Sequence, residues 1–235
     1  MNGFFGKVVS HGDFVSRRLP AVFLNRWDAW LQGGLQCSRE RLGAQWLEAY
    51  LCSPIWRFAL AAGVCGEQGW AGVMIPSVDR VGRYFPLTLA CAGDDAPLLM
   101  RLEQDALWYG RLERLALSAL SETFSLEVFD EAMVAMPSPG RWAPARHAST
   151  VVVAPRWLDL PDPQRIGDGM PQLSAWIDPL ALAGHSLFWT EGSPRVAPSV
   201  WVGEGLPGSD TFASCIRASS GAITQKLARI RDTSS

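Results

Sequence analysis

The sequence predicts an α/β protein, a three-layer αβα sandwich around a mixed central sheet. Apolar, β-prone runs alternate with segments whose apolar residues recur every three or four positions, the spacing of amphipathic helices. Two early runs, Ile55–Ala62 and Trp70–Ile75, are joined by a glycine-containing turn, which favours an antiparallel hairpin. Hydrophobic residues make up 48% of the 235 positions, enough to form a substantial core.

Local patterns predict the first elements. Phe4–Val9 is expected to be a strand, and Pro20 suits the first position of the helix that follows. The apolar stripe of that helix contains Phe23, Trp27, Trp30 and Leu31. The Gly33–Gly34 pair weakens the helix near its end, and a second helix is expected from about Ser38 to Pro54.

The middle of the chain contains the clearest break in composition. A strand is expected at Phe85–Ala92 and the longest helix at Leu98–Leu120. The segment Pro137–Ala145 has three prolines and is interpreted as a connection. We therefore expect an N-terminal α/β region, residues 1–136, and a C-terminal α/β region, residues 146–235, packed against it.

Signals after this connection are weaker. Strands are expected at Ser149–Ala154, Ser186–Thr190 and Val200–Gly203. The proline- and aspartate-rich stretch Pro155–Pro171 is expected to form loops. Short helices are expected at Asp210–Ala218 and Ala222–Arg231.

Composition excludes several classes of protein. The net charge of −2 gives no general attraction to nucleic acid or anionic lipid. The five cysteines form no CxxC pair and the three histidines are scattered, so neither a metal nor another cofactor is expected. No signal peptide and no run of 18 apolar residues is present, which predicts a cytoplasmic protein without membrane insertion.

Two polar segments stand out, each in a loop that adjoins a predicted strand. The first is Ser10–Asp13 followed by two arginines, and the second is Ser77–Arg83. Their candidate residues are His11, Asp13, Arg17, Arg18, Asp79, Arg80 and Arg83. A structural network, in which the aspartates cap turns and pair with arginines, is the favoured interpretation. A recognition surface built on the arginines is the second, and catalysis is the third.

The favoured interpretation makes a geometric prediction. Asp13 and Asp79 should lie near arginine side chains, among Arg17, Arg80 and Arg83, at one end of the sheet. The catalytic interpretation, a small hydrolase or transferase using His11, Asp13, Asp79 and Arg80, has weaker support. No nucleophile motif is present, and the side chains of adjacent residues such as Ser10 and His11 diverge on most backbones. No catalytic residue is therefore assigned.

A second possible partner surface lies on the predicted helix Leu98–Leu120. At 100° per residue, one face of this helix combines an aromatic and a leucine with charged groups, a composition typical of interface anchors. Its residues are Arg101, Asp105, Trp108, Arg111 and Leu115, with Gln104 beside them. A satellite contact beneath a loop is the alternative, and solvent exposure of Trp108 distinguishes the two.

Four segments together resemble the TagF family, also called ImpM, of bacterial type VI secretion. They are GFFGKVVSHGDFVSRRLP, WDAWL, WLEAYLCSPIWRFAL and WAGVMIPSVDRVGRYFPLTLA, all within residues 1–125. SLFWTEG and GLPGSDTFA resemble the second half of the family more loosely. The specificity comes from the order of the segments, since none would be sufficient by itself.

The resemblance implies a function that composition does not show. It implies a cytoplasmic, non-catalytic protein with a three-layer αβα fold that represses type VI secretion after translation. The implied partner is a forkhead-associated-domain scaffold protein of that system. The family assigns no established chemical role to the HGDF and PSVDRVGR segments, so the structural interpretation of both loops is kept. A structural subunit of the secretion machine remains a third possible function.

Overall fold

A computed structural model describes residues 1–93, 98–140, 156–158 and 184–216 of the chain. Its strands form one eight-stranded sheet in the order β2-β1-β5-β4-β3-β7-β8-β6. Those strands are β1 (Asn2–Gly6), β2 (Val15–Arg17), β3 (Trp56–Leu60), β4 (Gly69–Ile75), β5 (Leu87–Gly93), β6 (Arg156–Leu158), β7 (His185–Thr190) and β8 (Ser199–Glu204). The helices are α1 (Ala21–Leu42), a 3-10 turn (Gly43–Gln45), α2 (Trp46–Leu51), α3 (Leu98–Gln104), α4 (Ala106–Ser118), α5 (Leu126–Ala135) and α7 (Ser209–Ile216).

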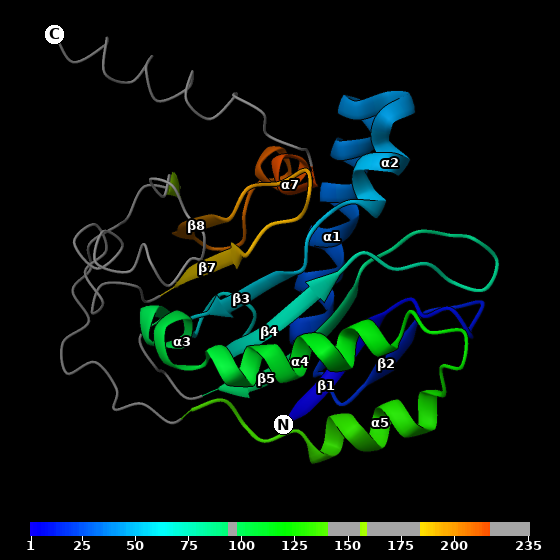
Figure 1. Ribbon diagram of the computed structural model, residues 1–235. Coiled ribbons are helices and arrows are strands. Elements are labelled where there is room, and N and C mark those ends of the chain that lie inside the picture. Colours follow the sequence, from blue (N-terminus) through cyan, green and yellow to red (C-terminus); the bar gives the residue numbers. More distant parts are fainter. Residues whose placement is uncertain (94–97, 141–155, 159–183, 217–235) are drawn as a thin grey trace, which may run out of the picture.

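Helices cover both faces of the sheet, so the predicted three-layer αβα sandwich is confirmed (Figure 1). The sheet itself is not mixed, because every pair of neighbouring strands in the described residues is antiparallel. The helices α1 and α2 connect β2 to β3, which are not neighbours in the sheet. Neighbouring strands are therefore not joined by the crossover helices that parallel pairing requires.

Alternation along the strands builds two cores. Ala59 and Leu187 face α3, α4 and α5, while their neighbours Phe58 and Phe188 face α1 and α7. Each strand therefore contributes apolar side chains to both layers, as a buried sheet requires. The strands β7 and β8, which follow residue 184, extend the same sheet, since β7 pairs with β3 and β8 pairs with β7. The division at residues 137–145 stays a prediction, and residues 141–145 lie outside the described ranges.

The helix α1 continues through the glycine pair that was expected to weaken it. At Gly34, an added Cβ atom would lie 2.4 Å from ring atoms of Phe212 on α7. The glycine thus allows α7 to pack directly against the backbone of α1. The helix ends instead at Gly43, whose positive φ of 51° turns the chain out of the helix.

The long helix predicted at residues 98–120 is interrupted at Asp105. This residue has φ −94° and ψ 15°, and its carboxylate accepts a hydrogen bond from the backbone of Gly140. The helix α5 and the short strand β2 were not predicted, and β6 lies where a loop was expected. The predicted strand at 149–154 and the final helix at 222–231 lie outside the described residues. Within the described ranges, no helix combines the length and apolarity needed to span a bilayer.

Candidate functional site

The two polar loops meet at one end of the sheet (Figure 1). The strands β1 and β4 both pair antiparallel with β5, which lies between them, so they run in the same direction and end at the same edge. Lys7 follows β1, and Asp79 follows β4 after a short connection. The backbone N–H of Arg80 donates to the carbonyl of His11 over 2.9 Å, which joins the loops as predicted.

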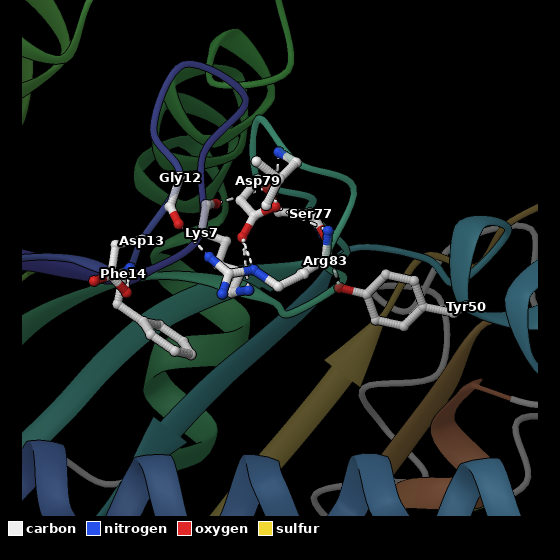
Figure 2. A network of polar contacts seen from close by, with 9 residues as sticks. Lys7, Gly12, Asp13, Phe14, Tyr50, Ser77, Asp79 and Arg83 are labelled. Carbon is white, nitrogen blue, oxygen red and sulfur yellow. Dashed lines mark hydrogen bonds and ion pairs between the residues drawn. The ribbon is translucent and has the colours of Figure 1, made fainter.

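Asp79 is the centre of the cluster (Figure 2). Its side chain is completely buried. Its Oδ2 accepts hydrogen bonds from Lys7 Nζ at 2.8 Å and Arg83 Nε at 2.7 Å. Its Oδ1 accepts from the backbone N–H groups of Val81 at 3.0 Å and Arg83 at 2.8 Å. The four donors fill the acceptor capacity of the carboxylate.

The electrostatics of Asp79 follow from these donors. Burial by itself would raise the pKa of this carboxyl. The hydrogen bonds from Lys7, Arg83 and Val81 outweigh burial and hold the pKa well below its usual range. Asp79 is therefore an ionised anchor at neutral pH, with neither a proton to donate nor a free lone pair to accept one.

Further contacts tie the cluster to α2 and to an exposed aromatic ring. Ser77 Oγ donates to the carbonyl of Lys7 at 2.7 Å. The buried Tyr50 hydroxyl on α2 donates to the Ser77 carbonyl at 3.0 Å and accepts from its N–H at 2.9 Å. Burial raises the pKa of Tyr50, so its hydroxyl stays protonated. Lys7 Nζ also lies 5.1 Å from the centre of the Phe14 ring, a cation–π contact.

The predicted arginines have different roles. Arg83 binds Asp79 as predicted, and it also donates to the Gly12 carbonyl. Arg18 instead pairs with Asp130 on α5 at 2.6 Å, and its hydrogen bond lowers the pKa of that carboxyl. Arg17 is exposed and donates to the carbonyl of its neighbour Ser16.

Two predicted residues remain outside the ion-pair network. The Oδ1 of Asp13 accepts from the backbone N–H of Phe14 at 2.8 Å, and within the described ranges Asp13 forms no ion pair, contrary to the prediction. The side chain of Arg80 forms no hydrogen bond or ion pair with the described residues. Sequence reasoning missed Lys7, although it is one of only two lysines and directly follows an apolar run.

The second predicted surface lacks its exposed anchor, so this prediction is wrong. Trp108 is 7% exposed, and its Nε1 donates to the carbonyl of Pro137 at 2.8 Å. Arg101 and Asp105 are buried and pair at 3.0 Å. The segment after α5 lies over this helix face, so the satellite contact beneath a loop is what forms. Arg111 is exposed, whereas Leu115 is half-buried against the core.

The comparisons with known proteins identify the family. A family model described as "TagF N-terminal domain, Type VI secretion system-associated" matches residues 3–136, more than half of the chain. The chain belongs to the TagF family. A search of curated proteins finds no match.

A solved structure is similar to this chain over nearly its whole length. It is the crystal structure of PA0076 from Pseudomonas aeruginosa PAO1, which is 36% identical and superimposes with a TM-score of 0.76. The match covers 95% of this chain and 97% of that one. The family match makes the chain a type VI secretion-associated protein. Both loops of the cluster lie within the matched residues, so the Asp79 network belongs to the family segment.

The TagF-family cluster contains one pair with potential chemistry. Ser10 Oγ and His11 Nδ1 are 2.8 Å apart, although their side chains were expected to diverge. No hydrogen bond joins His11 to Asp13 or Asp79 in the described part of the chain, so the base lacks the orienting carboxylate of a triad. Nor do the described residues contain a group of three or more His, Cys, Asp or Glu that could hold a metal ion.

A pocket is lined in part by Tyr50, whose hydroxyl contacts Ser77 of the cluster. Its lining is mainly apolar and includes Trp56, Met74 and Phe212. Neither His11 nor Asp79 contributes to it. The charged groups of the cluster and this pocket are therefore separate features.

Proposed function

We propose that this TagF-family chain is a cytoplasmic regulator that represses type VI secretion after translation by binding a forkhead-associated-domain scaffold protein. The observation that carries the proposal is the family match over residues 3–136. The geometry of the cluster is compatible with binding. The carboxylate oxygens of Asp79 accept hydrogen bonds from within the chain, while the neighbouring arginines reach solvent.

Direct titration tests the binding. The purified full chain, titrated into the purified scaffold of the same bacterium by calorimetry, should give saturable and reversible binding with fixed stoichiometry. In cells, raising the level of the chain should lower type VI secretion while the amounts of the secretion proteins stay constant. Absence of binding at high micromolar concentration, or repression accompanied by loss of those proteins, would contradict the proposal.

The contact between Ser10 and His11 favours a second candidate function, hydrolysis or group transfer. A hydroxyl within hydrogen-bond distance of an imidazole is the first requirement of a nucleophile–base pair. Purified protein assayed on a panel of esters and phosphate esters tests this candidate. Turnover that disappears in both Ser10→Ala and His11→Ala, and persists in the control Ser16→Ala, would support it. Turnover equal in all variants would reject it.

A further inference from the structure

The loop that carries Arg80 and Arg83 is held in one conformation by its own backbone. Asp79 N–H donates to the carbonyl of Arg83 at 3.1 Å, and Gly82 N–H donates back to that of Asp79 at 3.0 Å. Gly82 has a positive φ of 85°, which this tight turn requires. At the base of the loop, Phe85 N–H donates to the Ser77 carbonyl at 3.1 Å. A surface on this loop is preorganised, so binding to it costs little ordering entropy.

Two guanidinium groups converge beside this loop. Arg83 donates to the carbonyl of Gly12, and its side chain is 57% exposed. Arg80 Nη2 lies 3.7 Å from the position of a Cβ on the same Gly12. The donors of Arg80 have no partner in the described ranges, which leaves an exposed cation beside a second one. Such a pair of guanidinium groups binds carboxylates well.

Arg17 and Arg18 lie close to acidic side chains of α5. Arg18 pairs with Asp130, and Arg17 lies close enough to Glu127 and Asp130 to lower the pKa of both carboxyls, after stronger local hydrogen bonds. Around Gly12 the balance between positive and negative side chains is different. Among the described residues, Lys7 and Arg83 share the single carboxylate of Asp79, Arg80 forms no ion pair, and the exposed Asp13 adds one further negative charge. This end of the sheet is therefore locally positive on a chain whose net charge is −2.

Apolar side chains are exposed within the same loops. Val81, between Arg80 and Gly82, is 64% exposed. Phe14 is 44% exposed, although its ring contacts Phe85 edge-on at 4.8 Å. Apolar groups ringed by arginines have the composition of an interface hot spot.

From this arrangement we infer that the surface formed by Phe14, Arg80, Val81 and Arg83 is a docking site for an acidic protein segment that also carries an apolar side chain. The carboxylates of the segment bind the two guanidinium groups, and its apolar side chain packs on Val81 and Phe14. The inference rests on the proposed function in one respect, because it takes the scaffold protein as the source of the segment. Charge complementarity selects an acidic partner and disfavours a basic one.

The experiment uses the full chain and two charge-reversal variants. Arg80→Glu changes the proposed surface without breaking a hydrogen bond or ion pair among the described residues, and Arg114→Glu makes the same charge change on the exposed side of α4. The probe is a fluorescein-labelled peptide of alternating Glu and Leu, followed by anisotropy. Arg80→Glu should weaken its binding roughly tenfold at low salt, and Arg114→Glu less than twofold. Val81→Ser should weaken binding without changing its dependence on salt.

The outcomes separate the inference from the proposed function. If the wild-type chain does not bind the scaffold, the proposed function fails, and the peptide still decides the inference. If Arg80→Glu and Arg114→Glu bind the peptide equally, or the wild-type chain does not bind it, the docking site is wrong. Displacement of the peptide by millimolar inorganic phosphate, but not by chloride at equal ionic strength, would overturn the acidic segment in favour of a phosphate-bearing ligand.

Discussion

Two buried aspartates pair with basic side chains in this protein, and their surroundings differ. Asp79 binds Lys7 and Arg83 at the end of the sheet, where the outer side of the loop stays exposed. Asp105 binds Arg101 where the two helices α3 and α4 meet. There Gly140 covers the pair, since its N–H donates to Asp105 and its carbonyl accepts from Arg101.

This difference shows that a sequence pattern of aspartate and arginine does not by itself predict an exposed binding surface. Both patterns combine acid, base and an apolar neighbour, Phe14 in one case and Trp108 in the other. At the first, the loop residues Arg80–Arg83 stay exposed. At the second, the chain returns and uses the polar groups as partners for its own backbone. Four predictions separate the two regions, from the largest expected effect to the smallest.

Trp108→Ala should lower the free energy of unfolding by about 3 kcal/mol, or roughly 6–12 °C in Tm. The change empties a buried volume and removes the donor to the Pro137 carbonyl. Trp108→Phe, the control, keeps most of the volume and should lose about 1 kcal/mol. Differential scanning calorimetry measures both. An unchanged Tm in Trp108→Ala would mean that the covering segment does not pack on this ring.

Lys7→Met should lower Tm by roughly 5 °C, because it removes the buried cation that compensates Asp79. Arg83→Met should cost less, since that guanidinium is more than half exposed and water replaces part of its interaction. Circular dichroism, recorded during thermal unfolding, shows which variant loses more Tm. Equal losses in the two variants would show that burial does not distinguish the two partners.

Asp79→Asn should make stability less dependent on pH in acid. The folded-state pKa of Asp79 lies below its unfolded value, so its contribution is complete well above pH 4 and is lost as the pH falls through about 4 and below. The Tm gap between wild type and variant should therefore narrow between pH 6 and pH 3. A gap that stays constant over this range would contradict the lowered pKa.

Arg80→Ala and Arg111→Ala should each change Tm by less than about 1–2 °C, because both side chains are exposed. These variants sharpen the comparison by separating exposed basic groups from the buried Lys7 and Arg101. A larger loss in either variant would indicate that its side chain supports the fold.

Much of the layer structure could be predicted because periodicity is local. The predicted strands at 70–75 and 186–190 correspond to β4 and β7, and the helix after Pro20 corresponds to α1. The antiparallel sheet could not be predicted, since it depends on which distant strands become neighbours, such as β1 with β5. The helix α5 had a local signal, a Ser125 cap before Leu126, Phe129 and Met133, which was overlooked.

Part of the candidate site could also be predicted, because that part depends on residues close together in the sequence. The pairing of Asp79 with Arg83 is local, four residues apart, and turn chemistry indicates it. The contact of Asp79 with Lys7 spans 72 residues and depends on β1 and β4 ending at one edge. The burial of Trp108 depends on residues 137–140, which pack over it. The helical periodicity of residues 98–120 contains no information about where that later segment lies. Non-local contacts therefore account for most of the errors.

The pairing of β3 with β7 has a consequence for synthesis on the ribosome. Ala59 and Leu187 are opposite each other in this ladder, so the edge of β3 acquires its partner only after some 130 further residues have been translated. During that interval the nascent chain presents an open strand edge, and Trp30 on α1 lacks its contact with the ring of Phe212. Such an edge can recruit strands from other chains. Slow translation or early termination in this interval should therefore favour aggregation and engagement of chaperones.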